Sequence, residues 1–520
     1  MSVAGIAKTK AIGIAKKALA TANIDPALVK AAIRRPADVH GGPRTRRWPW
    51  PRRRNIDRRE RDAVMQLFER EIRQGGAIVY GGAEQKGYCD AFVRYLGGSG
   101  YAHAVNSGTN AVYVALRALD LPPGSEVIVP PITDAGGTMP VALMNCIPVP
   151  ADSAPGSLNT SIEQIRAVLT DRTSAIVVAH IAGHPVDMDP IIELANERGI
   201  PIVEDCAQAL GAVYKGRMCG SLGTIGAFSS MFGKQHCTGG QGGVVFTQST
   251  LLFARIRQIA DRGKPYGVVG PSAGNVIASL NFNQDEISMA IGRVQLEKLP
   301  AAIEGRRAFA AKVRAGMQGI AGVALIGQRD DCLDSPWFLM LRIDPQVLRC
   351  TSADFALGLE LEGVGGVSAG YPFYPTDYPW YREGNVYGAS GMPWSLAGAE
   401  RDAGTRSIEL PNAHEANRTI VRVDVHESLG ATEARDVIAA IAKLAKWFAA
   451  EPARATGSAQ PAAPIVTTAR PPGGAPSHHA PAAHYPPQPH GGGHQPHVAH
   501  TASKVGAGLS GPVARSHETG

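Results

Sequence analysis

VEDCAQALGAVYKGRMCGSLGTIGAFSSMFGKQHCTGGQGGVVFT, residues 203–247, places an acid, a hydroxyl and a lysine among many glycines. Asp205 follows a short apolar run, Ser229 ends another, and Lys234 lies five residues further on, just before the glycine-rich segment 238–243. Because glycine lets the backbone approach a ligand closely, such a segment suits the wall of a binding site. The stretch is therefore predicted to form the floor of a cofactor site.

This set of side chains matches the needs of pyridoxal phosphate (PLP) chemistry. A lysine forms a Schiff base with the aldehyde of PLP, and a carboxylate keeps the pyridine nitrogen protonated. Lys234 is the candidate for the first role and Asp205 for the second, and Ser229 is placed to bind a phosphate oxygen. Taken singly, each residue has a plainer interpretation: a helix-capping aspartate, a solvated loop lysine and hairpin glycines.

The order of these residues resembles the DegT/DnrJ/StrS family of PLP-dependent sugar aminotransferases, over roughly residues 75–448. That family has E-D-x-A-Q-A, as in 204–209, and then G-x-x-G-x-x-G-x-F-S, as in 220–229, followed by the Schiff-base lysine. The resemblance implies the fold type I α/β architecture of PLP transferases. It also implies that Asp205 pairs with the pyridine nitrogen and that Gln208 lies beside the phenolic oxygen of PLP.

The spacing around the lysine allows two alignments. Counting forward from Ser229 puts Lys234 at the Schiff-base position, whereas counting back from the glycines puts Gln235 there. The forward count is preferred because the chemistry requires a lysine.

A phosphate site is predicted at Ser107-Gly108-Thr109, where a helix begins. Backbone amides at a helix N-terminus bind anions, although a capping role for Ser107 explains the motif equally well. The family has N-S-G-T at this point, so the resemblance implies that Ser107, Gly108 and Thr109 bind the phosphate of PLP.

Two positions depart from the family pattern. Asp134 stands where many relatives place an aromatic residue that stacks on the ring; it would face a substrate or form a turn. The segment 281–286 resembles N-Y-R-M-x-E, which implies that Asn281 reaches the cofactor phosphate of a neighbouring subunit in a homodimer. The family's arginine is Asn283 here, so no carboxylate-binding role carries over to it.

Alternating strand-like and helical runs predict a mostly parallel sheet covered by helices. His180, at the end of one expected strand, is interpreted as a histidine satisfied by the backbone. The predicted domains are a basic N-terminal arm (1–57), a PLP-binding large α/β domain (58–300), a smaller C-terminal α+β domain (301–451) and a Pro/Ala/Gly/His-rich tail (452–520), expected to be disordered. An aromatic loop over 371–394 lies over the substrate pocket in the family, but its rings equally suit ordinary packing.

The distribution of charge, the cysteines and the hydropathy pattern indicate which partners, metal sites and cellular location to expect. Residues 1–60 hold 15 Lys and Arg against 4 Asp and Glu, so their net charge of +11 leaves −4 for the rest of a chain whose total is +7. The arm, with Trp48 and Trp50 among its arginines, could bind nucleic acid, an anionic membrane surface or an acidic partner. A solvated arm that packs its tryptophans on the enzyme body or on a sister subunit is preferred, because no nucleic-acid fold signature accompanies it. The seven scattered cysteines favour reduced thiols and no metal site. The sequence lacks an apolar membrane-length run or secretory signal, and a cytoplasmic location is expected.

The resemblance implies an aminotransferase with glutamate or glutamine as amino donor and a nucleotide-linked keto sugar or a keto cyclitol as acceptor. Two alternatives remain open. A PLP-dependent sugar dehydratase of this fold has histidine in place of the Schiff-base lysine, and the uncertain spacing beside His236 keeps it in view. A regulatory relative without turnover is the other.

Overall fold

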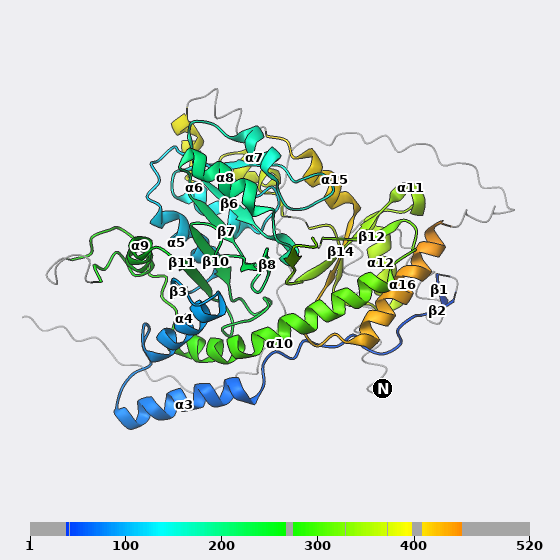
Figure 1. Cartoon of the computed structure of the whole chain (residues 1–520), viewed down its shortest axis with the longest axis horizontal. Coiled ribbons are helices and arrows are strands. Elements are labelled where there is room, and N and C mark those ends of the chain that lie inside the picture. Colours follow the sequence, from blue (N-terminus) through cyan, green and yellow to red (C-terminus); the bar gives the residue numbers. More distant parts are fainter. Residues whose placement is uncertain are drawn as a thin grey trace, which may run out of the picture. The chain divides into compact units, whose positions relative to one another are not determined.

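A seven-stranded sheet forms the centre of the computed structural model, which describes residues 38–40, 42–266, 274–327, 329–371, 373–397 and 408–449 (Figure 1). Its five neighbouring strands from β10 to β5 are parallel, and β11 runs antiparallel to both β3 and β10. The mostly parallel sheet predicted from the sequence is confirmed. Its strands, in spatial order, are β3 (Tyr101–Val105), β11 (Gly243–Thr247), β10 (Ile225–Ser229), β7 (Ile202–Asp205), β6 (Thr173–Ala179), β4 (Glu126–Val129) and β5 (Ile147–Pro150).

Helices cover both faces of this sheet, which is why most strand residues are apolar rather than alternating. One face packs against α5 (Gly108–Ala118), α6 (Met139–Leu143) and α9 (Thr250–Ala260). The opposite face packs against α4 (Ala83–Tyr95), α7 (Ile162–Val168), α8 (Met188–Arg198) and α10 (Glu286–Gly316). The carboxyl ends of β6, β7 and β10 therefore meet at one edge, where open α/β sheets place their ligands.

A second, antiparallel sheet has the order β12 (Val323–Ile326), β14 (Phe338–Ile343), β16 (Ile420–Asp424) and β15 (Val367–Ala369). One face of it packs against α12 (Ser352–Glu362) and α16 (Ala431–Ala449). The other face, which carries Phe338, Met340 and Ile420, packs against Ile132 and Ile181 of the first sheet's loops. This contact places the second sheet beside the carboxyl edge of the first.

The remaining short elements lie in the connections. They are η1 (Ala135–Gly137), η2 (Ile181–Gly183), the small sheet β13 (Cys332–Leu333), β8 (Val213–Tyr214) and β9 (Arg217–Met218), then α11 (Pro345–Leu348), η3 (Pro375–Asp377), α13 (Pro379–Arg382), η4 (Gly388–Ser390), η5 (Trp394–Ala397) and α15 (Pro411–Thr419). In the aromatic loop, Tyr381 and Trp394 pack on Ile147 and Val149 of β5. Those two rings serve ordinary packing.

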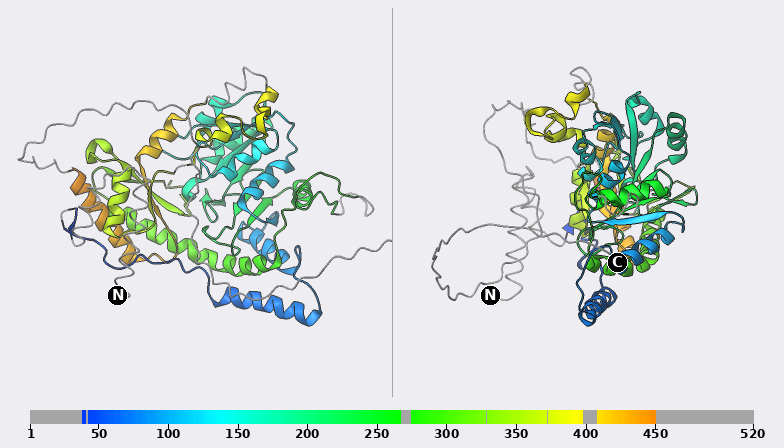
Figure 2. Two further views of the ribbon diagram at one scale, coloured as in Figure 1. Left: turned by 180° about the vertical axis from the view of Figure 1, so that it is seen from behind. Right: turned by 90° about the vertical axis from the view of Figure 1, so that its left-hand side faces the viewer.

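Helix α10 connects the two layers. It contacts α4 and α3 (Arg58–Gln74) near its beginning and α16 near its end, and Figures 1 and 2 show it running beside both sheets with α3 on its outer side. A single helix continues through Pro300. The proposed boundary between the two domains, at residue 300, thus falls inside α10.

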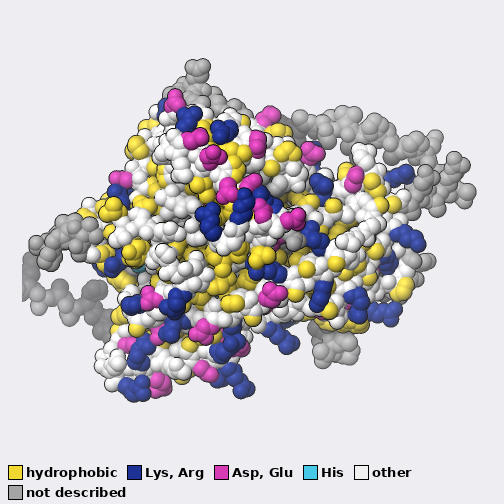
Figure 3. Space-filling view, viewed as in Figure 1, with side chains coloured by type: hydrophobic (Ala, Val, Ile, Leu, Met, Phe, Trp, Pro, Cys, Tyr) yellow, Lys and Arg dark blue, Asp and Glu magenta, His cyan; other side chains and the backbone are white. Residues whose placement is uncertain are grey.

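The described part of the basic arm, residues 38–40 and 42–57, packs on the enzyme body. It begins with a hairpin of β1 (Asp38–Val39) and β2 (Gly42–Pro43). Arg46 is buried and bonds Asp436 of α16 at 2.7 Å, while its guanidinium lies over the rings of Trp48 and Trp50. Basic and acidic side chains intermingle across the face shown in Figure 3, including along α3.

Three other expectations concern the chain as a whole. All seven cysteines are buried and unpaired. Among the described residues, no helix is both long and apolar enough to cross a membrane. Residues 1–37 of the basic arm and the tail 452–520 lie outside the described residues.

Candidate active site

The N-terminus of α5 meets Ser229 at the carboxyl edge of the large sheet. A side chain at Gly108 would collide with Ser229, since a Cβ there would lie 2.9 Å from its Oγ. Ser107 caps the helix, because its hydroxyl accepts a hydrogen bond from the Asn110 amide at 3.1 Å. The capping interpretation is therefore confirmed. Capping also leaves the first amides of α5 pointing toward Ser229, an arrangement that suits a phosphate.

Asp205, the last residue of β7, is a buried carboxylate. Its Oδ1 accepts a hydrogen bond from the Ala207 amide at 3.0 Å, and burial raises its pKa. Among the described residues, no lysine, arginine or histidine forms an ion pair with it within 4.0 Å. A buried carboxylate in this state gains from a cationic partner, because an opposite charge stabilises its ionised form.

The loop after β4 approaches the same place through two glycines. A Cβ on Gly136 would lie 2.5 Å from Thr109 Oγ1, and one on Gly137 would lie 3.0 Å from Asp205 Oδ2. Only glycine permits these approaches. The loop, the α5 N-terminus and the end of β7 therefore border one site.

Asp134 forms the turn of this loop and also faces the site. Its Oδ1 accepts a hydrogen bond from the Gly136 amide at 3.1 Å, as in a turn-forming aspartate. Its charge raises the pKa of Lys234, against the larger effect of burial. It also raises the pKa of Asp205, in the same direction as burial, which has the larger effect. The negative charge is thus within electrostatic reach of both groups.

Lys234 lies in the turn after β10 and is only 8% exposed. Burial lowers the pKa of its amine to about 8, although Asp205 and Asp134 act in the opposite direction. Its Nζ lies 3.7 Å from the ring centroid of Trp337, whose indole nitrogen donates to the Gly233 carbonyl at 3.1 Å. A buried lysine with a lowered pKa is a better nucleophile and base near neutral pH than a solvated one.

The neighbouring Gln235 has a different environment. Its amide nitrogen donates to the backbone carbonyls of Gln208 and Ser335. These contacts hold its side chain against the backbone. The assignment of the Schiff-base position to Lys234 stays a prediction.

Gln208 joins the two sheets at the site. Its Oε1 accepts from the Ala182 amide and its Nε2 donates to the Tyr371 hydroxyl, both at 2.8 Å. Tyr371 begins the aromatic loop, so this part of the loop borders the site, as the resemblance implied. Trp337 and Tyr371 were not predicted individually; an aromatic residue in a strand or loop gives no signal that distinguishes a site from a core.

Asn281 lies apart from this cluster of contacts. Its side chain is exposed, and its Oδ1 accepts hydrogen bonds from the backbone and side-chain nitrogens of Asn283. A single chain does not bring it to Lys234 or Ser229, so its role in phosphate binding stays a proposal.

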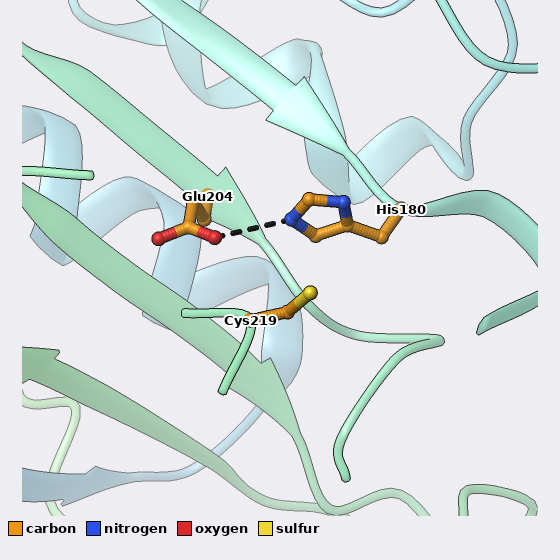
Figure 4. A group of neighbouring side chains, drawn as sticks. All are labelled: His180, Glu204 and Cys219. Atoms are coloured by element: carbon orange, nitrogen blue, oxygen red, sulfur yellow. Dashed lines mark hydrogen bonds and ion pairs between the residues drawn. The ribbon is translucent and has the colours of Figure 1, made fainter. Parts of the chain in front are cut away.

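A buried network behind Asp205 is made by Glu204, His180 and Cys219 (Figure 4). Glu204 accepts from the amides of Gly220, Leu222 and Gly223 at 2.6–2.8 Å. His180 accepts from the Val186 amide through Nδ1, so its Nε2 carries the hydrogen that it donates to Glu204 at 3.1 Å. Three ligand types meet here, but the oxygens and the ring nitrogens are already used by these bonds, and the arrangement supports the strand end that carries Asp205.

Glu204→Gln is expected to lower the free energy of unfolding by about 3 kcal/mol, because an amide would place N–H groups against backbone donors and break a buried charged contact. Denaturant unfolding followed by fluorescence measures the change. Glu197→Gln, at an exposed position of α8, is the matched control and should change stability little. Equal midpoints for the two variants would contradict this account of the network.

These residues fit PLP. The α5 N-terminus and Ser229 would hold the phosphate, the unpaired Asp205 carboxylate would receive the ring nitrogen, and Lys234 supplies a buried amine between them. The glycines at 108, 136 and 137 leave the space that side chains would fill.

The fold and this site define a PLP-binding enzyme of the fold type I class. The model of the DegT/DnrJ/EryC1/StrS aminotransferase family matches residues 59–442, and the chain belongs to that family. Its cofactor is pyridoxal 5′-phosphate.

Individual relatives are similar over part of their length. GDP-perosamine synthase of Caulobacter vibrioides is 36% identical over 218 residues, which cover 42% of this chain and 57% of that enzyme. dTDP-3-amino-3,4,6-trideoxy-alpha-D-glucose transaminase of Streptomyces venezuelae is 34% identical over 258 residues, 50% of this chain and 66% of the relative. The matches thus span less than two thirds of these curated relatives. The crystal structure of the aminotransferase from Psychrobacter cryohalolentis superposes with a TM-score of 0.65 at 29% identity, covering 76% of this chain and 97% of that one.

Proposed function

We propose that the chain is a PLP-dependent aminotransferase that moves an amino group from glutamate or glutamine to a nucleotide-linked keto sugar or a keto cyclitol. The observation that carries the proposal is the buried Lys234 amine, which lies over the Trp337 ring and within electrostatic reach of the buried Asp205 carboxylate. Family membership supports it.

Each side chain has a defined part in this reaction. Bound PLP supplies the electron sink that makes a proton on the donor's Cα acidic. Lys234 Nζ takes that proton, since an amine with a pKa of about 8 is partly uncharged near neutral pH. Asp205 would keep the ring nitrogen of bound PLP protonated, and the α5 amides with Ser229 would hold its phosphate. Trp337 covers one side of Lys234 and excludes water from it.

Arg422 is the cation placed to bind the donor's carboxylate. It lies in β16, on the sheet face that packs toward the site, with its guanidinium carbon 5.1 Å from the Phe338 ring and 5.4 Å from the Tyr371 ring. Its Nε is buried, and the nearest acid, Asp424, lies 3.8 Å away, beyond hydrogen-bond distance. Tyr371 bonds Gln208, so the Tyr371 side chain alone lies between Arg422 and a residue proposed to bind the cofactor.

Arg422→Gln is expected to raise the donor KM about 10- to 100-fold, the loss of one charged hydrogen-bonding contact, with a smaller change in kcat. Steady-state kinetics with glutamate and glutamine measure it, together with calorimetric binding of the dicarboxylate glutarate. Arg342→Gln, exposed on the same sheet, is the control. An unchanged donor KM in the Arg422 variant would rule out this assignment.

The acceptor class rests on the relatives. The two enzymes described above are named for nucleotide-linked amino sugars. The direct test is to supply glutamate or glutamine carrying ¹⁵N in the α-amino group with a panel of nucleotide-linked keto sugars and keto cyclitols, and to detect labelled amine by mass spectrometry. Labelled product supports the proposal; a deoxygenated product without label would indicate the dehydratase instead.

His236 bears on that dehydratase alternative. It is 1% exposed, bonds the Tyr88 hydroxyl at 2.6 Å, and burial lowers its pKa to about 3. It therefore packs inside the core, while the lysine borders the site. This placement favours amino transfer over the dehydratase, and the retention of Asp205, Ser229 and Lys234 favours it over a regulatory relative.

The enzyme is further proposed to act in the cytoplasm as a homodimer in which Asn281 completes the neighbouring subunit's phosphate site. The exposure of Asn281 supports this arrangement. Sedimentation at several concentrations tests the assembly.

A further inference from the structure

The N-terminal arm contacts the turn that carries Lys234 through one arginine. Arg53 Nη1 donates to the Phe232 carbonyl and Nη2 to the Gln235 carbonyl, both at 3.1 Å. These two carbonyls bracket Gly233 and Lys234. The guanidinium thus bonds the turn on both sides of Lys234, although Arg53 lies 181 positions before Lys234 in the sequence.

The same guanidinium also bonds Glu427, which follows β16 of the antiparallel sheet. Arg53 Nε donates to Glu427 Oε1 at 2.8 Å, and the other oxygen of Glu427 accepts from Arg306 of α10 at 2.9 and 3.2 Å. Burial opposes ionisation of Glu427, but Arg306 and Arg53 together lower its pKa. Glu427 is therefore a charged bridge between the two arginines.

Arg306 connects Glu427 to the segment that contains Trp337, on the other side of Lys234. It is 1% exposed, and its Nη1 donates to the carbonyls of Pro336 and Val425. Pro336 precedes Trp337, which bonds the Gly233 carbonyl and covers Lys234 Nζ. The turn is held by Arg53 on one side and by Trp337 on the other, and both supports meet at Arg306 and Glu427.

We propose that Arg53 is a positioning residue of the active site, which fixes the Lys234 turn and links it through Glu427 to the segment that follows β16 of the antiparallel sheet. The inference rests on the proposed function for its catalytic meaning, although the restraint itself exists without cofactor. The arm therefore contributes a residue that positions the active site. Its other arginines at 52 and 54 are exposed, so the effect belongs to this one side chain.

The experiment compares Arg53→Ala, Arg53→Lys and the control Arg52→Ala in the full-length chain. Hydrogen exchange of cofactor-free protein is followed by mass spectrometry over residues 231–238, where the Phe232 and Lys234 amides bond the Gly240 and Met231 carbonyls. Exchange should become at least about tenfold faster in Arg53→Ala, because opening of the turn no longer breaks charged hydrogen bonds. Arg53→Lys should lie between, since lysine keeps the charge without the fork of donors.

A second readout is the amine itself. The pH dependence of its reaction with an acylating reagent, read by peptide mapping without cofactor, should move upward from about 8 in Arg53→Ala as the turn opens to water. With PLP, kcat should fall more than donor KM changes. Wild-type exchange and pH dependence in a folded Arg53→Ala variant would overturn the inference, even if amino transfer is established. Faster exchange without any amino transfer would support the restraint and refute the proposed function. If the alanine variant does not fold, the lysine variant decides by the same two readouts.

Discussion

Lys234→Ala is expected to lower the rate of amino transfer by at least about 10²–10⁴-fold, the contribution of a positioned general base. The loss follows because the variant has neither the amine that binds PLP nor the group that moves the proton on the donor's Cα. Single-turnover mixing of the PLP-loaded variant with glutamate measures the rate. The fold should be unchanged, since among the described residues the Lys234 Nζ forms no hydrogen bond or ion pair and lies over the ring of Trp337.

The double variant Lys234→Ala/Gln235→Lys tests the two sequence alignments directly. The side chain at 235 is directed toward the carbonyls of Gln208 and Ser335, away from Asp205. A lysine moved there should not restore activity. Recovery of wild-type rates would show that the spacing counted back from the glycines is the correct one.

Asp205→Asn is expected to reduce kcat by about 10²–10³-fold, comparable with loss of one preorganised electrostatic partner. Asparagine preserves volume but cannot keep the ring nitrogen protonated. Rates with glutamate should fall, while phosphate binding through α5 and Ser229 should persist.

The pH dependence of cofactor-free Asp205→Asn adds an independent check. Asp205 raises the pKa of Lys234 against burial, so the amine in this variant should titrate below the wild-type value of about 8. Reaction of Lys234 with an acylating reagent, followed across pH, measures it. An unchanged titration would show that the two groups do not interact.

The sequence predicted the large sheet because short apolar, strand-like runs alternate with helical patterns along the chain. The principal site residues were predicted because they lie within one stretch, 203–247, and one helix start, 107–109. Local order in the chain was enough for Lys234, Asp205 and Ser229 to be placed near one another.

The parts that could not be predicted come from distant segments. Trp337, Tyr371 and Arg422 belong to the second sheet and its loops, and they reach the site only because that sheet packs against the carboxyl edge of the first. Arg53 lies in an arginine-rich run in which nothing distinguishes it from Arg52 or Arg54; its position follows from the path of the arm across Glu427. The continuity of α10 through Pro300 likewise depends on packing against α3, α4 and α16 rather than on local preference.

An absorbance spectrum of the purified protein with PLP, recorded before and after addition of glutamate or glutamine, tests the central claim most directly. A visible band of lysine-linked cofactor should be present in the wild type, absent in Lys234→Ala, and converted by the donor into the spectrum of pyridoxamine phosphate. A wild-type protein without that band, or a band that the Lys234→Ala variant retains, would contradict the account.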